Sequence, residues 1–403
     1  MPVSGEIRQR TVVAGSPKMN VLLVSRNFPP MVGGIERLMH HVYLELKSVA
    51  DISVVGPPGS ERYLEARHGF ASCRLRPAAV FLVCMQWRAF QLAGRMKPGL
   101  VIAGSGMAAL AALIAARRRS VPVVCFVHGL DLVATNPVYR AVFLPAIRRC
   151  DKVIANSLNT ARLAQEIGVA PGRIEVVYPG VSVASIDAVT SEPKFRAKFG
   201  LQGRIVLLSV GRIHPRKGLA KFVESVMPAL VSSGFDVMLV VIGSEPTHAL
   251  KSAVGEAGRI LEAARLSGLE RRIMMLGAVD DQTLISAYRE SDVLVFPVQD
   301  QVGDVEGFGM VAVEAAAHGL PTVAFAVGGV PDAVADGVSG YLVPAGDYAG
   351  FAEGIMRVLA AESGMWRVRC LRHANKYAWE VFGERIRAIC RALGSDPKPP
   401  NSV

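Results

Sequence analysis

Two glutamates eight residues apart, Glu306 and Glu314, flank a glycine-containing segment that could bind a ligand bearing hydroxyls and phosphates. The segment follows the apolar run 293–296 and leads into an alanine-rich stretch typical of a helix. Where a strand ends and a helix begins, free backbone N–H groups and the positive end of the helix dipole favour phosphate. We expect Glu306 in the loop and Glu314 about two turns inside the helix, where both carboxylates can accept hydrogen bonds from hydroxyls. Hydroxyls at both ends with phosphates between them describe a nucleotide-sugar.

A basic segment, 210–218, follows the apolar run 205–210 and offers two cations for the same phosphates. Arg212 carries a guanidinium that can bind phosphate in a bidentate manner, and Lys217 carries a compact positive charge. Neutralising a leaving diphosphate is a large requirement of glycosyl transfer. No Asp-x-Asp motif stands at the end of a predicted strand. We therefore expect fixed cations to do this work, and no metal site is predicted.

Short apolar runs alternate with helical patterns along the chain, as in parallel sheets covered by helices on both faces. At 403 residues the chain exceeds the usual size of a single core. The sequence therefore predicts an α/β fold with two doubly wound, Rossmann-like domains and a ligand-binding cleft between the carboxyl ends of their strands. The predicted strands are residues 21–24, 52–55, 101–103, 123–127, 153–155 and 174–177 in the first half, and 205–210, 237–242, 273–276, 293–296 and 322–325 in the second.

The predicted boundaries divide the chain into four parts. Residues 1–18 form a flexible extension, 19–185 an acceptor-binding domain, 186–375 a nucleotide-sugar-binding domain, and 376–403 a final helix and tail. We expect the final helix, from about 379 to 393, to pack back on the first domain. Residues 100–116 are apolar but fall short of the about 20 residues that span a bilayer, so they predict a buried strand and helix. No secretory signal pattern begins the chain, which favours the cytoplasm.

Positive charge is concentrated in the first half. Residues 1–185 contain 22 Lys and Arg against 10 Asp and Glu, whereas residues 186–403 contain 23 against 24. A basic half implies an anionic partner, either an acidic membrane surface or a phosphate-bearing acceptor. Nucleic acid is disfavoured because the basic residues are not interleaved with stacking aromatics. Six scattered cysteines without a CxxC spacing argue against zinc and against a disulfide framework, and favour a reducing compartment.

With these motifs in view, the chain resembles the family 4 retaining glycosyltransferases of the GT-B fold, of the bacterial mannosyltransferase and cell-surface polysaccharide transferase type. The resemblance covers about residues 19–395. It rests on the motifs at 33–34, 128–131, 155–157, 211–218, 306–314, 328–332 and 337–343.

The resemblance implies a role for each matching residue. The residues expected to act at the reacting centre are His128, Arg212, Lys217 and Glu306, with His128 near the C6 hydroxyl of the sugar and Glu306 on other sugar hydroxyls. The residues expected to bind the donor are Gly33, Gly34, Val279, Gly307, Phe308, Gly309 and Glu314. Within that set, Gly33 and Gly34 would close over the diphosphate, the backbone of 307–309 would contact it, Glu314 would bind the ribose, and Val279 would lie beside the base.

The implied reaction is transfer of a hexose, of mannose type, with retention at the anomeric carbon. The acceptor would be lipid-linked or a glycan, in lipopolysaccharide, exopolysaccharide or glycolipid biosynthesis. No cofactor is expected, and the enzyme would work in the cytoplasm or peripherally on the cytoplasmic face of the inner membrane. The stretch 303–307 resembles that of enzymes using GDP-mannose, and UDP-sugars stay open.

Two alternatives share the same architecture. A nucleotide-sugar 2-epimerase would bind the same donor without an acceptor, and a non-catalytic module would bind nucleotide-sugar or glycan without turnover. A dinucleotide dehydrogenase is excluded, because no G-x-G-x-x-G motif follows the first strand.

Overall fold

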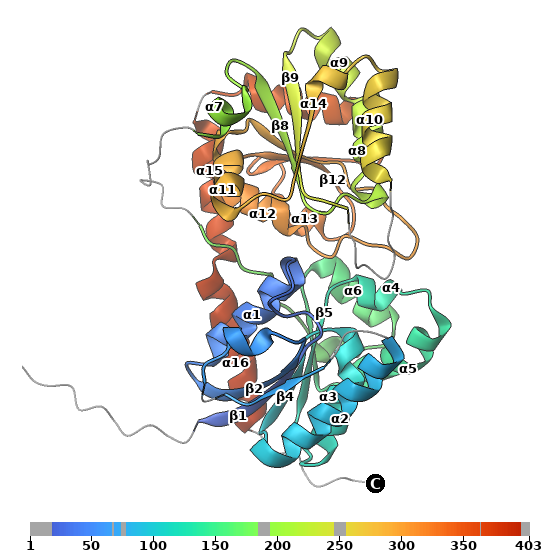
Figure 1. Ribbon diagram of the computed structural model, residues 1–403, viewed down its shortest axis with the longest axis vertical. Helices are drawn as coiled ribbons and strands as arrows, with labels where there is room; N and C mark the ends of the chain where they lie inside the picture. Colours follow the sequence, from blue (N-terminus) through green and yellow to red (C-terminus); the bar gives the residue numbers. More distant parts are fainter. Residues whose placement is uncertain are drawn as a thin grey trace, which may run out of the picture.

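The computed structural model describes residues 18–66, 68–73, 78–183, 194–245, 255–362 and 364–395. The extension predicted over 1–18 therefore lies outside the described residues except for Lys18, as do the boundary predicted at 185–186 and the tail beyond residue 395. The described residues form two parallel sheets, one above the other in Figure 1, each packed between helices. This arrangement confirms the predicted fold of two doubly wound α/β domains.

The first sheet has seven parallel strands in the order β3-β2-β1-β4-β5-β6-β7. Their bounds are β1 Met19–Val24, β2 Ala50–Gly56, β3 Phe70–Ser72, β4 Leu100–Ala103, β5 Val123–Val127, β6 Lys152–Ala155 and β7 Ile174–Val176. Six of them match the predicted strands within two residues at either end. β3 was not predicted, because it has three residues and lies at the edge of the sheet.

The second sheet has six parallel strands in the order β10-β9-β8-β11-β12-β13. Their bounds are β8 Ile205–Val210, β9 Val237–Ile242, β10 Ile273–Gly277, β11 Val293–Phe296, β12 Thr322–Phe325 and β13 Gly340–Val343. The five predicted strands are present. The sixth, β13, begins at a glycine and occupies the other edge, where a continuous apolar run is not needed.

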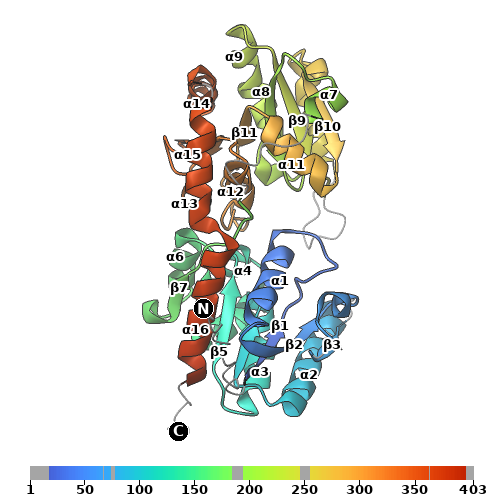
Figure 2. The ribbon, with the colours of Figure 1, turned by 90° about the vertical axis from the view of Figure 1, so that its left-hand side faces the viewer.

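Alternate residues of β1 show how the first domain is layered. Val21 and Leu23 pack into a core with α1 (Gly34–Leu46) and α16 (Trp379–Ser395) on one face of the sheet. Leu22 and Val24 pack into a core on the other face, which is covered mainly by four of the longer helices. These are α2 Ala78–Met96, α3 Ala109–Arg117, α5 Pro137–Arg149 and α6 Leu158–Glu166. The final helix thus lies on the first domain, as Figure 2 also shows.

Residues 100–116 form β4, a 3-10 turn at Gly106–Ala108 (η2), and most of α3. The strand is fully buried, as are most residues of the helix that face the core. Among the described residues no helix is both long and apolar enough to cross a bilayer.

Nine further helices and the short helical turns complete the described residues of the second domain and its connections. The helices are α7 Phe195–Phe199, α8 Leu219–Ser225, α9 Met227–Ser232, α10 Glu256–Leu266, α11 Asp281–Glu290, α12 Met310–Ala317, α13 Val330–Ala333, α14 Tyr348–Ala360 and α15 Met365–Ala374. The first domain also has the short helix α4, Leu130–Val133. The remaining 3-10 turns are η1 Ser60–Tyr63, η3 Pro171–Arg173, η4 Pro215–Lys217, η5 Glu270–Arg272 and η6 Asn375–Tyr377.

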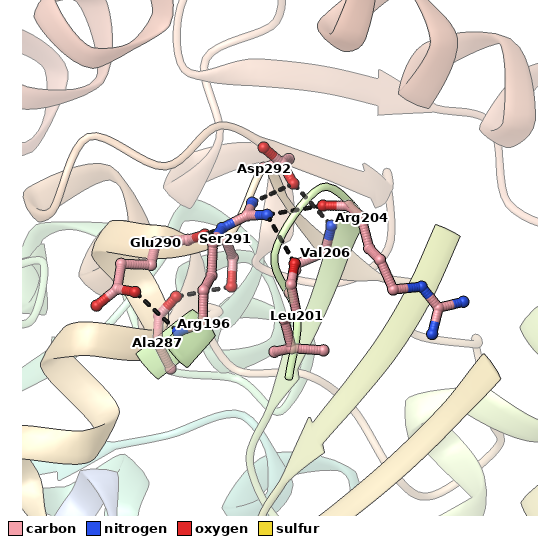
Figure 3. Close-up of polar contacts among 8 residues, drawn as sticks. All are labelled: Arg196, Leu201, Arg204, Val206, Ala287, Glu290, Ser291 and Asp292. Carbon is pink, nitrogen blue, oxygen red and sulfur yellow. Dashed lines mark hydrogen bonds and ion pairs between the residues drawn. The ribbon is translucent and has the colours of Figure 1, made fainter. Parts of the chain in front are cut away.

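A polar network fixes α7, the first element of the second domain, against its sheet (Figure 3). The carboxylate of Glu290 accepts hydrogen bonds from three successive backbone N–H groups at 194–196, at 2.9 to 3.0 Å. Arg196 donates to the carbonyl oxygens of Glu290 and Arg204 and to Asp292 Oδ2, each at 2.7 Å. Because Asp292 also accepts the N–H of Val206 in β8, the network ties the start of the domain to its central strand.

Two segments cross between the domains side by side. Val181 donates its N–H to the carbonyl oxygen of Tyr377 at 2.7 Å, and Val181 and Ala378 form a parallel bridge. A Cβ on Gly180 would lie 2.1 Å from the ring of Trp379, so only glycine fits against that side chain. The crossing point is therefore a packed contact between the two connections rather than a pair of loose linkers.

Candidate active site

Four charged side chains gather at the carboxyl ends of β8 and β11. Glu306 Oε2 accepts hydrogen bonds from Arg216 Nη1 at 2.6 Å and from Lys217 Nζ at 2.7 Å. The Nε of Arg216 also lies 3.1 Å from Oδ1 of Asp304. All four side chains are between 10% and 17% exposed, so these ion pairs are largely shielded from solvent. We call Arg216, Lys217, Asp304 and Glu306 the charged cluster.

Local backbone geometry explains why the two halves of the charged cluster meet. Gly218 has a left-handed φ of 69°, and a Cβ there would lie 2.1 Å from the carbonyl oxygen of Pro297. Gln299 donates its N–H to the carbonyl oxygen of Arg216 at 2.8 Å. Glycine therefore permits the turn at η4 to press against the loop that follows β11, which brings Arg216 and Lys217 to Glu306.

The electrostatics of the charged cluster keep its carboxylate ionised. Burial alone would raise the pKa of Glu306, but the charges of Lys217 and Arg216 outweigh burial and hold it at about 2. Burial lowers the pKa of Lys217, whose ammonium lies 4.6 Å from the centre of the Phe296 ring. Glu306 offsets the burial of Arg216, whose pKa is raised. A buried cation held by a carboxylate can exchange that partner for the oxygens of a bound anion.

Glu314 projects from α12 and is held by both domains. Its Oε1 lies 2.6 Å from Nη1 of Arg37 in α1, and its Oε2 accepts a hydrogen bond from the hydroxyl of Tyr288 at 3.0 Å. The position expected about two turns inside the helix is wrong, because α12 begins at Met310 and Glu314 lies just over one turn in. Gly309 has a left-handed φ of 96°, which keeps the preceding loop out of the helix.

The first domain contributes His128, which directly follows β5. Its Nε2 donates to the carbonyl oxygen of Gly104 at 2.8 Å, and its buried Nδ1 has no hydrogen-bond partner among the described residues. In the neutral ring that Nδ1 can accept a hydrogen bond from a ligand hydroxyl. A Cβ on Gly307 would lie 2.2 Å from the carbonyl oxygen of His128, so the two domains touch here through backbone.

Other contacts hold the domains together beside His128. Asp332 Oδ2 accepts the N–H of Leu158, at the start of α6, at 2.6 Å, and burial raises the pKa of Asp332. A Cβ on Gly34 would lie 3.0 Å from the sulfur of Met310, which places the first turn of α1 against the first turn of α12. Helix starts of the two domains therefore meet here, α1 with α12 and α6 with α13.

The structure brings some of the predicted residues together and leaves others apart. Lys217 meets Glu306, Gly307 meets the backbone of His128, and Gly34 lies against Met310, the first residue of α12. Arg212 is exposed and forms no ion pair with a described residue, so it does not join the charged cluster. The side chain of Phe308 is buried against Tyr178, with ring centroids 5.6 Å apart, which leaves only its backbone for a ligand.

The remaining predicted donor-binding residues have simpler surroundings. Val279 lies just beyond β10 and is half-buried against the core of the second domain. Gly33 precedes α1, and a Cβ there would lie 2.3 Å from a carboxylate oxygen of Glu36. Gly309 immediately precedes α12, with the Phe296 ring 3.2 Å from where a Cβ would stand.

Sequence reasoning missed Arg216, Asp304, Arg37 and Asp332. Arg216 stands beside Lys217, so its charge was visible, but only the turn at η4 shows that it points to Glu306. Arg37 had no signal, because its partner is 277 residues away. Asp332 lies in the motif 328–332 that carried the family resemblance, so the motif was a signal without a stated role.

Among the described residues no group of three or more His, Cys, Asp or Glu side chains could hold a metal ion. His214 lies 3.9 Å from Asp304, but the neighbouring cations Arg216 and Lys217 occupy the carboxylates that a metal would need.

Comparison with known proteins adds to this geometry. Residues 32–185 match a family described as Glycosyltransferase Family 4, and residues 204–361 match Glycosyl transferases group 1. D-inositol 3-phosphate glycosyltransferase of Geodermatophilus obscurus is 34% identical over 302 residues, covering 70% of this chain and 64% of the relative. The enzyme of the same name from Mycolicibacterium vanbaalenii is 33% identical over 287 residues, covering 66% and 60%. The chain thus spans about 60% of the length of the curated relatives it matches.

Solved structures share the fold at low sequence identity. HepE of Anabaena in complex with UDP-glucose has a TM-score of 0.73 and 20% identity, covering 93% of this chain and all of that chain. Sucrose-phosphate synthase of Thermosynechococcus elongatus has a TM-score of 0.75 and 19% identity, covering 94% of this chain and all of that chain. Both similarities show the GT-B fold. Because the two family models together match more than half of the chain, one for each sheet, the chain belongs to the glycosyltransferases that combine a family 4 domain with a group 1 domain.

Proposed function

We propose that the protein is a retaining hexosyltransferase that uses a nucleotide diphosphate sugar as donor. The observation that supports this most strongly is the charged cluster, where Lys217 and Arg216 share Glu306 in the loop that leads into α12. Two buried cations next to a helix start suit a diphosphate, and a carboxylate between them suits sugar hydroxyls. His128, one backbone contact away from Gly307, supplies a hydrogen-bond acceptor from the other domain.

Donor binding exchanges partners within the charged cluster. The diphosphate oxygens take over Lys217 and Arg216, and the exposed Arg212 adds a cation that has no ion-pair partner among the described residues. Glu306 is then released from its cations and turns its oxygens to the hydroxyls of the sugar. Glu314 exchanges Arg37 for the ribose hydroxyls in the same way.

Transfer occurs by front-face attack. The bond between the anomeric carbon and the phosphate oxygen breaks while the acceptor oxygen forms its bond on the same face, which gives retention. The acceptor proton passes to the leaving phosphate oxygen, so no enzyme carboxylate acts as nucleophile. Lys217, Arg212 and Arg216 stabilise the charge that develops on the diphosphate.

We propose that no metal ion takes part, because three cations serve the same phosphates. Activity is then expected to survive an excess of chelator. Complete loss of activity in chelator, restored by magnesium or manganese, would contradict this proposal.

Donor and acceptor identity rest on different arguments. The UDP-glucose complex of HepE supports testing UDP-hexoses first, whereas the resemblance of the stretch 303–307 supports GDP-mannose. We propose a lipid-linked or glycan acceptor in cell-surface polysaccharide or glycolipid synthesis at the cytoplasmic side of the membrane. The names of the curated relatives add a phosphorylated inositol to the acceptors worth testing.

The test is incubation of purified protein with a panel of UDP-hexoses and GDP-mannose, with and without acceptors. Slow hydrolysis of one donor to nucleoside diphosphate and sugar is expected, lost in Lys217→Ala, and the sugar released first has the anomeric configuration of the donor. Conversion of a donor into its 2-epimer would indicate the epimerase instead. Tight binding of a donor that is neither hydrolysed, transferred to any acceptor tested, nor converted into its 2-epimer would indicate the non-catalytic module.

A further inference from the structure

Helix α2 carries two apolar faces, although the core needs only one. Phe81, Met85 and Ala89 face the core that they share with Leu22 and Val24 of β1, and they are at most 4% exposed. Val80, Val83 and Trp87 lie on the opposite side and are 54%, 69% and 59% exposed. Their spacing of three and four residues places them in one stripe along the helix. A second apolar stripe on the solvent side of a helix marks a surface that another apolar phase covers.

Phe90 and Gly94 continue this stripe, and basic side chains flank it. Positions 90 and 94 extend the same spacing, and the guanidinium of Arg118 lies over Phe90 at 4.7 Å from the ring centre. A Cβ on Gly94 would lie 2.8 Å from the same guanidinium. Arg118 comes from the turn after α3, so the end of α3 lies against the C-terminal half of α2 (Figure 1). Exposed arginines at 88, 95, 117 and 119 surround the stripe.

The sequence around these helices lacks acidic residues altogether. Between Glu65 and Asp131 it contains nine Lys and Arg and no Asp or Glu. This segment supplies most of the excess positive charge of residues 1–185. The arginines around α2 and α3 therefore have no carboxylate near them in the sequence that could neutralise the surface.

We propose that this α2–α3 surface, formed by Val80, Val83, Trp87, Arg88, Arg95 and Arg117 to Arg119, docks on an anionic lipid bilayer. The valines and the tryptophan would enter the boundary between headgroups and acyl chains, and the arginines would lie on the anionic headgroups. The role of this docking, which is to hold the enzyme beside a lipid-linked acceptor, rests on the proposed function. Binding itself requires no transfer activity.

Charge and chemistry favour a bilayer over the other occupants. A second copy of the chain would bring one acid-free basic surface against another, which is repulsive. Nucleic acid would match the charge, but of the three exposed apolar side chains only Trp87 offers a face on which a base can stack, whereas binding to single strands uses successive aromatic rings. α2 also lies on the side of the first domain opposite α16, so docking there leaves the packing of the final helix untouched (Figure 2).

The first experiment is co-sedimentation of the full chain with vesicles of phosphatidylcholine alone or mixed with phosphatidylglycerol, at two salt concentrations. Binding to the anionic vesicles is expected, weaker at high salt. Replacing Arg117, Arg118 and Arg119 by Ser weakens it by up to about 100-fold if all three contact headgroups. The matched control replaces Arg259, Arg265 and Arg357, which are exposed on the second domain, and leaves binding within about twofold at the same net charge.

The second experiment tests the apolar stripe. Trp87→Ser is expected to weaken binding by about tenfold, whereas Leu266→Ser, at a side chain 72% exposed on the second domain, leaves it unchanged. Of the three tryptophans, Trp366 and Trp379 are buried, at 8% and 7% exposure. Anionic vesicles should therefore shift the emission of Trp87 to the blue. The shift disappears in Trp87→Phe, which still binds.

Two results would overturn the proposal. One is equal, salt-insensitive association of all variants with neutral and anionic vesicles. The other is no association with vesicles of either kind. Light scattering of the parent and Trp87→Ser would then show whether the chain self-associates through Trp87 or stays monomeric, and either result counts against the proposal. Vesicle binding by a protein that hydrolyses no nucleotide-sugar would instead retain this inference and refute the proposed function.

Discussion

The two domains contain nearly equal numbers of basic residues and use them differently. Residues 1–185 have 22 and residues 186–403 have 23, but the acids number 10 and 24. In the second domain Arg196 and Arg216 are largely buried and lie 2.6 to 2.7 Å from carboxylates. In the first domain Arg117 to Arg119 are exposed and lie in a segment without acids. On the same type of sheet, the placement of acids decides whether a basic residue binds within the protein or is left for an external anion.

The two domains also differ in what they present along the line where they meet. The first domain presents mainly backbone, namely the carbonyl oxygen of His128 and the N–H of Leu158. The second domain presents carboxylates, including Asp332 and Glu314. Two side chains of the first domain also reach the second: Arg37 meets the carboxylate of Glu314, and the hydroxyl of Thr160 donates to the carbonyl oxygen of Gly307 at 3.4 Å. The first domain thus contributes mainly neutral groups at this line, whereas the second contributes carboxylates.

The largest expected difference between a buried, paired arginine and an exposed one is in the free energy of unfolding. Arg216→Ala leaves Asp304 without its cation and Glu306 with one cation fewer, and we expect a loss of about 3 kcal/mol in the free energy of unfolding. Arg212→Ala, four residues away and exposed, should stay within about 0.5 kcal/mol. Urea unfolding of both variants measures the difference. Equal losses would show that burial in the charged cluster does not distinguish the two.

Removing Lys217, a cation assigned to the leaving diphosphate, should lower the rate of sugar transfer. Lys217→Ala is expected to lower the transfer rate by about 10² or more, as loss of a preorganised charge stabiliser does. Lys221→Ala, which removes an exposed lysine paired with Glu224, should leave the rate unchanged. Steady-state transfer by both variants on the donor found in the panel is the measurement. A Lys217→Ala enzyme with the parent rate would remove that residue from the reaction.

Acid should weaken the contact between α1 and α16. His41 stacks on Trp379 with ring centroids 3.5 Å apart, and burial, followed by nearby His40 and Arg37, lowers the pKa of His41 to about 4. Below pH 6.5 the unfolded chain binds a proton that the folded chain refuses, so stability falls from pH 6.5 toward pH 4. His41→Phe keeps the stack without the proton. We expect His41→Phe to reduce the loss in the free energy of unfolding between pH 7 and pH 5 by about 1 kcal/mol, because His41 is partly exposed.

Thermal and urea unfolding of parent and His41→Phe at the two pH values give this comparison. A pH dependence identical in both proteins would show that His41 does not titrate against folding.

The smallest expected effect concerns the one side-chain ion pair described above that joins the domains. Arg37 is half exposed, so its pair with Glu314 contributes about 0.2–1 kcal/mol. If Glu314 binds ribose, Arg37 competes with it, and Arg37→Met should tighten nucleoside diphosphate binding by up to about fivefold. Arg62→Met, an exposed arginine of the same domain, serves as the control. Weaker binding by Arg37→Met would mean that Arg37 itself holds the nucleotide.

The sequence predicted the sheets well because the strands of parallel sheets are buried on both faces and form continuous apolar runs. β3 and β13 were not predicted, because edge strands of three or four residues need no such run. The pairing of Lys217 with Glu306 was within reach of motif reasoning. The position of Glu314 was not, because Gly309 delays the helix start, and a left-handed glycine is not visible as such in a sequence.

Contacts set by tertiary geometry were beyond the sequence. Arg212 and Arg216 are equivalent as residue types, and only the turn at η4 makes Arg216 the one that meets Glu306. The pairs Arg37 with Glu314 and Leu158 with Asp332 join residues 277 and 174 positions apart. They depend on how the domains sit on one another, which no local pattern encodes.

The exchange of partners in the charged cluster is the central claim, and Glu306→Gln tests it most directly. Isothermal titration of parent and variant with free UDP and GDP, alongside transfer activity and thermal unfolding, is the measurement, with Glu353→Gln, an exposed glutamate on α14, as the control. The account predicts that Glu306→Gln loses transfer but binds the preferred nucleoside diphosphate at least as tightly as the parent, because Lys217 and Arg216 no longer have to leave a carboxylate. A folded Glu306→Gln protein that no longer binds the diphosphate, or that still transfers sugar at the parent rate, would contradict it.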